Sequence, residues 1–509
     1  MSCSLRSTSP TFAFDSSRNL RKSKVRQIQV LCSSTPSEPS NRNPQNSRGQ
    51  AQQNVILVER YRDGTSKRYI LDNDLHVRTF LEEKGIETNG FHGSQFSNVA
   101  LSWLPDVIRD FILPAGFPGS VSDDYLEYML LQFPTNVTGW ICHALVTSSL
   151  LKACQSNPGH IRFHFVQAVG VGSFSGTTAA ASAAAIRWVS KDGIGAVGRL
   201  FIGGRFGNLF DDDPKQWRMY ADFIGSAGSI FDLTTQLYPA YFLPLASLGN
   251  LTKAVARGLK DPSFRVIQNH FAISGNLGEV AAKEEVWEVA AQLLGLSVGI
   301  LILDAPVVSA SYLLLGSTWM TMRLLHLWLR YQSLSVLQFN SINLKRARIL
   351  VKSHVLHATI PGCVDCNRME NILLWQRFLK PRIVFGVSLE EMLGGQISVS
   401  MVKILLKLYA KEKYILVVNK QQKVDFDVFV SFKVGATSLS VLRSVWQTYW
   451  LHQNWDGNAD FCDQLEQSLG ELEGRFQNFM EQLEEAGWNT HQLSLKVPKA
   501  QSFEEIGVV

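Results

Sequence analysis

FVQAVGVGSFSGTTAAASAAAI, residues 165–186, is the stretch that best predicts the fold. None of its 22 residues carries a charge, and Gly, Ala, Ser and Thr outnumber all other types. Such side chains bury little area, so we expect their role to be close backbone approach. Gly172 and Gly176 stand one helical turn apart, as in small-xxx-small helix contacts. Residues 289–303 (VAAQLLGLSVGILIL) repeat this glycine spacing in a more apolar frame. The sequence therefore predicts closely packed helices in this region.

The whole chain has 509 residues, more than one hydrophobic core usually holds, so two or three structural units are expected. Hydrophobic residues make up 46% and charged residues 18%, and the apolar residues are concentrated in runs, which argues against disorder. The pattern is helical from Leu101 to about Arg377. We expect a mainly α fold with a multi-helix core.

The formal net charge of +5 is confined to the N-terminus. Residues 1–32 hold six basic residues and one acid, so the remainder is neutral and nothing argues for nucleic-acid binding. The same residues are rich in Ser and Arg, poor in acids and without a continuous apolar stretch, which is typical of an organelle transit peptide. We expect a plastid (chloroplast) transit peptide here, with an ordinary disordered N-terminus as the alternative.

Strand patterns stand at the two ends of the chain. Residues 55–61 and 67–71 are strand-like and flank Asp63-Gly64, a dipeptide typical of tight hairpin turns. Strand-like runs at 414–418 and 426–432 are followed by two helical patterns, at 438–452 and 460–486. The predicted parts are a transit peptide at 1–32, a disordered linker at 33–54, a β-hairpin cap at 55–96, a helical core at 97–330, a basic helical connector at 331–377 and a C-terminal α+β domain at 378–509.

Three uncharged runs bear on whether the core spans a membrane. Residues 233–252, 289–303 and 305–322 hold 20, 15 and 18 residues without a charge, and roughly 20 apolar residues are needed to cross a bilayer. Interior prolines and many Ser, Thr and Gly residues argue against spanning, because buried helices of large soluble bundles show the same pattern. A proline also interrupts residues 129–151, at Pro134. We expect membrane-associated, transmembrane helices, with a soluble all-α core as the alternative.

The sharpest polar cluster of the core lies between His270 and Glu285. Glu279 and Lys283 stand at i and i+4, in the favourable order for an ion pair on one helix, which is the structural interpretation. If the segment lines a cavity or lies in a membrane, the same groups are costly to bury and become candidates for ligand binding. The candidate ligand-binding residues are His270, Asn276, Glu279 and Lys283.

Three further motifs have a structural and a functional interpretation. His354, His357, Cys363 and Cys366 supply four zinc-type ligands at a spacing that matches no standard finger, so they are a metal site, a thiol redox pair at the two cysteines, or incidental residues. Residues 193–198 match GxGxxG, but an Ala-rich helical pattern precedes them, which favours a turn between helices over a phosphate-binding loop. Residues 211–213 (DDD) suit a hard cation or a helix cap, with Asp213, Pro214 and Gln216 forming a helix start.

Four stretches of the core are long enough to be specific: LPAGFPGSVSDDYLEY (113–128), DDDPKQWRMYADFIGSAG (211–228), FLPLASLGNLTKAVARG (242–258) and HFAISGNLGEVAAKEE (270–285). In order and spacing they resemble the plant root UVB sensitive family. Residues 343–383 look most similar to the sixth member of that family. The resemblance implies a part in light and UV-B responses, seedling development and auxin distribution, together with other family members, and assigns no reaction.

No nucleophile elbow, P-loop or HExxH motif is present in the sequence, so we assign no catalytic residue and no cofactor. The leading hypothesis is a plastid, membrane-associated protein with a regulatory or small-molecule-handling role. One alternative is a soluble helical scaffold that binds other family members. Another is an enzyme or cofactor-binding protein that uses the segment from His270 to Glu285, with a vitamin-derived phosphate as a candidate ligand.

Overall fold

A computed structural model describes residues 55–60, 66–71, 77–82, 105–155, 193, 196–207, 209–238, 241–306, 311–375, 378–395, 398–419, 426–457, 459–498 and 501–504. The predicted transit peptide, the predicted linker and residues 165–186 lie outside the described residues. The chain divides into two compact units, Met1–Glu87 and Thr88–Val509.

The first unit contains a three-stranded antiparallel sheet. Strand β1 (Val55–Arg60) pairs with β2 (Ser66–Leu71), and β2 pairs with β3 (Val77–Glu82), so the strand order is β1-β2-β3. The third strand was not expected from the sequence. Its alternation of Val77, Thr79 and Leu81 with Arg78 and Glu82 is a period-2 pattern that its charged residues obscure.

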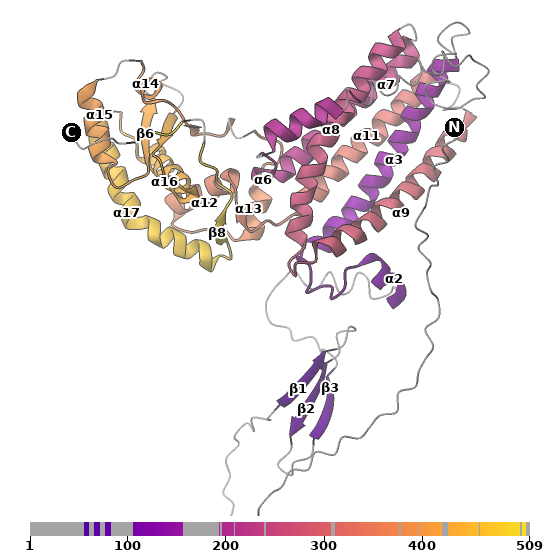
Figure 1. The fold of residues 1–509 in the computed structure, drawn as a ribbon, viewed down its shortest axis with the longest axis horizontal. Coiled ribbons are helices and arrows are strands. Elements are labelled where there is room, and N and C mark those ends of the chain that lie inside the picture. The colour runs from indigo at the N-terminus through magenta and orange to yellow at the C-terminus, as the bar shows by residue number, and fades with distance from the viewer. Residues whose placement is uncertain are drawn as a thin grey trace, which may run out of the picture. The chain divides into compact units, whose positions relative to one another are not determined.

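The second unit begins with the helical core. Its helices are α2 (Asp106–Ile112), α3 (Tyr125–Gln155), α6 (Leu209–Asp212), α7 (Pro214–Leu237), α8 (Phe242–Phe271), α9 (Leu277–Asp304) and α11 (Tyr312–Val336). Figure 1 shows α3, α7, α8, α9 and α11 running side by side, with α3 packed against α7, α9 and α11. The expectation of a mainly helical protein is confirmed.

Local sequence explains where α7 begins. Asp213 is the N-cap, and its carboxylate accepts a hydrogen bond from the backbone N–H of Gln216 at 3.2 Å. Pro214 occupies the first turn, where its missing N–H leaves no hydrogen bond unmade. This is the helix start expected from residues 213–216, and it gives Asp213 a capping role.

Close backbone approach, expected from the small residues, occurs where α9 crosses α3. A Cβ atom added at Gly295 would lie 2.6 Å from the carbonyl oxygen of Val137, and one at Gly299 would lie 2.8 Å from Cβ of Ala144. Only glycine permits this separation, because real Cβ contacts essentially never fall below 3.0 Å. The same device recurs where α7 meets α8, at Gly228.

Pro134 does not end a helix, although the sequence predicted a break there. Helix α3 continues through Pro134, which was expected to interrupt it. Loss of one backbone donor is tolerated because the helix is long and packed against α7, α9 and α11. The uncharged run 233–252 is instead divided, since α7 ends at Leu237 and α8 begins at Phe242.

The C-terminal domain is α+β. Its elements are β4 (Ser341–Ile342), α12 (Leu344–His357), α13 (Cys363–Met369), β5 (Arg382–Phe385), α14 (Leu389–Met392), α15 (Val399–Leu408), β6 (Tyr414–Asn419), β7 (Asp427–Phe432), α16 (Ser438–Asn454), α17 (Phe461–Glu485) and β8 (Asn489–Leu493). In the sheet β5-β7-β6, β5 is parallel and β6 antiparallel to β7. The strands and helices expected after residue 414 all form within two residues of their predicted ends.

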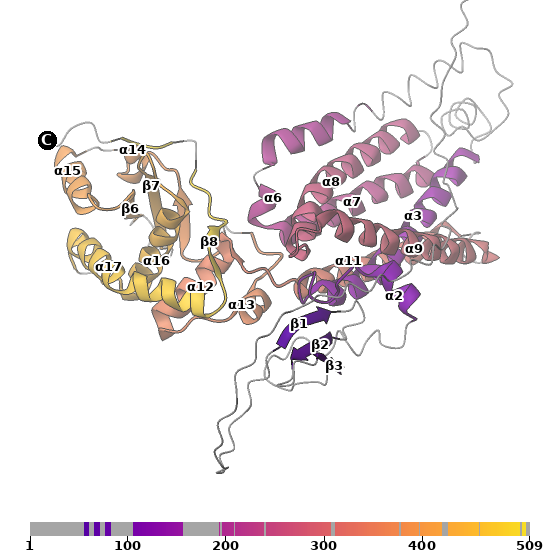
Figure 2. The same cartoon turned by 60° about the horizontal axis from the view of Figure 1, so that its bottom comes forward.

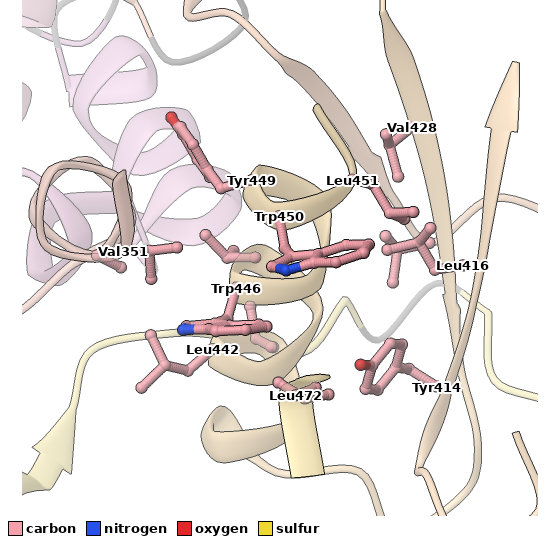
Figure 3. Close-up of a cluster of buried hydrophobic side chains, with 14 of the residues drawn as sticks. Val351, Tyr414, Leu416, Val428, Leu442, Trp446, Tyr449, Trp450, Leu451 and Leu472 are labelled. Atoms are coloured by element: carbon pink, nitrogen blue, oxygen red, sulfur yellow. The ribbon is translucent and has the colours of Figure 1, made fainter. Parts of the chain in front are cut away.

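Helix α16 forms the centre of this domain's core. Figure 2 shows it between α12, α17 and the sheet, and Figure 3 shows the rings of Trp446 and Trp450 projecting from it among apolar side chains. Val351 of α12 belongs to the same core. Part of the stretch 331–377, expected to be a connector, is therefore an integral element of the C-terminal domain.

Buried charges join the helical core to this domain. We call this set the junction network: Lys215, Arg346 and Glu370, with Asn343 and Asn367. Glu370 Oε2 lies 3.3 Å from Lys215 Nζ and 3.1 Å from Arg346 Nε, and all three side chains are at most 1% exposed. Burial alone would raise the pKa of Glu370, but the charges of Arg346 and Lys215 lower it to about 2. The carboxylate is therefore ionised in the folded protein.

Candidate functional site

The four residues expected to bind a ligand lie around the connection between α8 and α9. Nε2 of His270, in the last turn of α8, donates to Oδ2 of Asp124 at 3.0 Å. Asp124 also accepts from the backbone N–H of Gln338 at 2.7 Å and from the hydroxyl of Ser122. His270 is thus one partner of a carboxylate that links the start of α3, the end of α8 and the segment after α11.

Glu279 and Lys283 do not pair with each other as expected. Glu279 accepts from the backbone N–H of Ala115 at 2.6 Å, and Lys283 donates to the backbone oxygens of Asp110 at 2.5 Å and Phe111 at 3.2 Å. Glu279 thus attaches the first turns of α9 to the segment between α2 and α3, and Lys283 attaches them to the last turn of α2. Asn276 precedes α9, and its buried amide makes no hydrogen bond to any described residue. The contacts of Glu279 and Lys283 hold α9 against the residues that precede α3.

The candidate metal ligands are not gathered. Among the described residues, which include all four, no group of three or more His, Cys, Asp or Glu side chains is placed to hold a metal ion. Nδ1 of His354 accepts from Nε1 of Trp446 at 3.2 Å inside the C-terminal core, whereas His357 is exposed. Cys366 is fully buried, and burial raises its pKa to about 12, which disfavours the thiolate that a metal requires.

Two further motifs take the structural interpretation. Gly198, the last glycine of the GxGxxG match, lies in the helical residues 196–206 and faces Leu251 and Val255 of α8. In the run 211–213, the carboxylate of Asp213 is the α7 cap and lies 2.6 Å from Lys345 Nζ.

A set of buried charges that was not among the predicted sites lies between α3, α7 and α11. We call it the interior cluster: Gln132, Arg218, Asp222, His326 and Arg330. Oδ2 of Asp222 lies 2.6 Å from Arg330 Nε and 3.1 Å from Arg218 Nη1. Arg330 also donates to the side-chain oxygen of Gln132. One carboxylate is thereby shared by two guanidinium groups, both at most 2% exposed.

His326 completes the cluster from α11. Its Nδ1 donates to the backbone oxygen of Thr135 at 2.8 Å, which fixes the proton on that nitrogen. Its Nε2 lies 3.7 Å from Oδ2 of Asp222 and makes no hydrogen bond to any described residue. The ring is held in position because Gly139 of α3 leaves room for it, with an added Cβ only 3.2 Å from its Cε1.

Several donors around the cluster have no acceptor. Nε of Arg218 and the hydroxyls of Tyr125 and Tyr128 are buried and make no hydrogen bond to any described residue, whereas Nη1 of Arg218 faces the Asp222 carboxylate. Arg218 and Tyr128 lie within electrostatic range of each other and of Glu284. A buried donor without an acceptor costs free energy, roughly 1–3 kcal/mol. The arrangement therefore suits a small group rich in acceptor atoms, such as a carboxylate or a phosphate.

The large exposed side chains of α9 and α11 are apolar. Leu293 and Leu301 of α9 are 64% and 70% exposed, and Leu313 and Trp328 of α11 are 77% and 57% exposed. Every exposed residue of α11 between Leu313 and Trp328 is uncharged. By length and composition α9 is the one helix among the described residues that qualifies to cross a membrane; its most apolar 18-residue window has a mean hydropathy of 1.9 and is 17% buried.

A sequence signal for the interior cluster did exist. His326 and Arg330 stand at i and i+4 in α11, whose one other basic residue is Arg323, and Arg218 and Asp222 have the same spacing in α7. Polar side chains on one stripe of an apolar helix indicate that this stripe faces a polar interior. These residues lie outside the uncharged runs, since the run 305–322 ends before His326 and Arg330.

Comparison with known proteins shows the family of the chain. A family model described as a vitamin B6 photo-protection and homoeostasis domain matches residues 99–358, and one for the C-terminal part of root UVB sensitive protein matches residues 359–499. Protein root UVB sensitive 5 of Arabidopsis thaliana is 66% identical over 455 residues, which cover 87% of this chain and 86% of that protein. The chain belongs to the root UVB sensitive family.

Within the root UVB sensitive family, two other Arabidopsis thaliana proteins are less similar. Root UVB sensitive 6 is 27% identical over 376 residues, covering 72% of this chain and 69% of that protein. Root UVB sensitive 2, chloroplastic, is 26% identical over 306 residues, covering 60% and 64%. The expected likeness to the sixth member is wrong, because the fifth shares far more of its sequence with this chain. No solved structure matches the chain.

Proposed function

We propose that this root UVB sensitive protein is a membrane-embedded binding protein, in which α9 and α11 face lipid and the interior cluster holds a small, acceptor-rich molecule. The observation that carries the proposal is the reversed polarity of the core. Arg218 and Arg330 are buried in the helical core, whereas the large exposed side chains of α9 and α11, such as Leu301 and Leu313, are apolar. Charged groups within membranes face the bundle interior, and helices there pack through small residues, as Gly295 does.

The proposed ligand class is a vitamin B6 vitamer. The family model that matches the core is described by vitamin B6 photo-protection and homoeostasis. A phosphorylated vitamer carries a phosphate and a phenolic oxygen, and these acceptors suit the unpaired donors of Arg218 and Tyr128. The proposed role is regulatory or small-molecule handling in UV-B response, seedling development and auxin distribution, alongside other family members.

The proposed location is a plastid membrane. Residues 1–32 have the composition of a transit peptide, and the printed name of root UVB sensitive 2 includes the word chloroplastic. Intact plastids that carry the tagged full-length protein test this proposal by fractionation and alkaline washing. We expect retention in the washed membrane pellet. Release into the supernatant would instead favour a soluble helical scaffold, and absence from plastids would refute the location.

Ligand binding is tested with Tyr128→Phe. The Tyr128 hydroxyl makes no hydrogen bond to the described protein, so its removal should leave the thermal stability unchanged or slightly higher. If the hydroxyl donates to a phosphate, the variant should bind pyridoxal 5′-phosphate about tenfold to a hundredfold more weakly, as expected for a hydrogen bond to a charged group. Fluorescence titration of the full-length protein in detergent measures the affinity.

The matched control is Tyr238→Phe, which removes a hydroxyl from an exposed tyrosine at the far end of α7. Equal affinities of wild type and both variants would contradict the proposed site. Binding of the unphosphorylated vitamer with the same affinity would contradict a role for the phosphate.

A further inference from the structure

Residues 368–375 and 378–382, from the end of α13 to the start of β5, form what we call the basic-aromatic segment. Met369, Leu373, Trp375 and Phe378 are all exposed, Phe378 by 61%. Four large apolar side chains exposed within so short a stretch mark an interaction site rather than the scattered exposure that is normal for a surface.

The charge of this surface is positive. The described residues of the segment contain Arg368, Lys380 and Arg382 and a single acid, Glu370, and Asp365 is exposed three residues before Arg368 in α13. Glu370 is buried in the junction network, so it does not offset the outward charge. Arg368, Lys380 and Arg382 are exposed, and Arg382 is also 3.6 Å from Asp427. The surface therefore combines apolar side chains with basic ones and has no exposed acid among its described residues.

Helix α7 fixes the position of the segment. The hydroxyl of Tyr220 donates to the backbone oxygen of Leu373 at 3.0 Å, and Nε2 of Gln216 donates to that of Leu374 at 3.2 Å. The ring of Trp375 meets the ring of Tyr220 edge-on, with centroids 6.1 Å apart. Trp375 thus lies at the level of Tyr220 along α7.

A second aromatic level stands at the other end of α7. Tyr238 and Tyr241 are both exposed there, and Tyr238 follows Tyr220 by 18 residues. At 1.5 Å per residue the two levels are about 27 Å apart, close to the roughly 30 Å thickness of the hydrocarbon layer of a bilayer. The large exposed residues of α7 between them are Phe223, Ile230 and Leu237, all apolar.

From this arrangement we infer that the basic-aromatic segment docks on anionic lipid headgroups and holds the C-terminal domain at the membrane surface. Trp and Tyr rings favour the headgroup level, and Arg and Lys beside them attract anionic lipids. The inference rests on the proposed membrane-embedded core for the direction of the membrane normal. It adds the lipid class and the surface that contacts it.

The test uses full-length protein reconstituted in vesicles of phosphatidylcholine with or without fluorescent phosphatidylglycerol. Benzoylphenylalanine, a photocrosslinking aromatic residue, replaces Phe378. We expect a light-dependent crosslink to phosphatidylglycerol, and none from the same residue at Leu439, which is exposed on the C-terminal domain at the start of α16. Each basic residue near an anionic surface strengthens lipid attraction about fivefold. Arg368→Gln combined with Lys380→Gln should therefore lower the preference for phosphatidylglycerol over phosphatidylcholine roughly twentyfold.

The matched control is Lys403→Gln combined with Lys407→Gln, which removes the same charge from exposed positions of α15 and should leave the preference unchanged. Equal crosslinking to both lipids would overturn the anionic specificity, and a crosslink to a protein alone would overturn lipid as the occupant. Alkaline washing of the same vesicles separates the two proposals. Alkali-resistant protein without a lipid crosslink refutes this inference alone, whereas extractable protein refutes the embedded core.

Discussion

Replacing Glu370 by Gln tests the junction network most directly. The substitution keeps the shape of the side chain but removes the carboxylate that contacts both Lys215 and Arg346. Two cations, each 1% exposed, would then be buried without their counter-charge. Removing one partner of a buried ion pair costs about 3–5 kcal/mol. Because the amide can still accept from Asn343, we expect a loss near the lower limit, about 3 kcal/mol.

Urea unfolding of the full-length protein in detergent, followed by tryptophan fluorescence, measures this loss. Trp446 and Trp450 report on the C-terminal core because both are buried in it. With a urea dependence of about 1–3 kcal/mol per molar, the midpoint should fall by roughly 1–3 M. Glu473→Gln is the control, since its pair with Lys411 is exposed on both sides and contributes under about 1 kcal/mol. Equal midpoints for the two variants would refute the reasoning.

Three other predictions follow from single contacts. The pKa of Glu370 is about 2 in the folded protein and lies below its ordinary value of 4.5. The stability that its carboxylate contributes is therefore fully present above pH 4.5 and is lost as the pH falls toward 2. Across this range the urea midpoint should fall less for Glu370→Gln than for wild type. Gly295→Ala should destabilise the protein by about 1–3 kcal/mol, because the added Cβ would meet the Val137 carbonyl where α9 packs on α3. Gly316→Ala has open space around the added Cβ and should stabilise the protein by about 0.5–1 kcal/mol. Thermal melts of both variants measure these shifts, and shifts of similar size and sign would contradict the prediction. Cys366 should resist alkylation at pH 8 until the protein unfolds, because burial raises its pKa to about 12. Mass spectrometry of the labelled protein measures the extent of alkylation, and a rapid reaction would contradict the prediction. Chelators should leave the melting temperature unchanged.

Much of the fold was predictable because its signals are local. The cap at Asp213, the glycine spacing at Gly295 and Gly299 and the elements after residue 414 are each written in a few neighbouring residues. Pro134 misled the prediction, since the cost of a proline in a helix is local but its tolerance depends on the packing of α3. Strand β3 was missed because its period-2 pattern mixes apolar and charged residues.

The candidate site was less predictable. Polar side chains can bind a ligand or hold helices together, and the sequence does not distinguish the two. In the structure, His270, Glu279 and Lys283 each contact the segment 110–124. The residues of the interior cluster are separated by long stretches of chain. Arg330 follows Asp222 by 108 residues and Gln132 by 198. No short motif encodes such a pairing.

By itself, the sequence determined the helical character of the core, its tight glycine contacts, the α+β nature of the C-terminal domain and the family. Helices, caps and strands arise from hydrogen bonds between near neighbours in the chain, and these leave periodic patterns. Only the tertiary structure decided which charges meet, that Nε of Arg218 is buried without an acceptor among the described residues, and that α9 and α11 expose large apolar side chains. Those properties depend on which remote segments remove water from a side chain, and burial sets the free energy of a charge far more than its place in the sequence does.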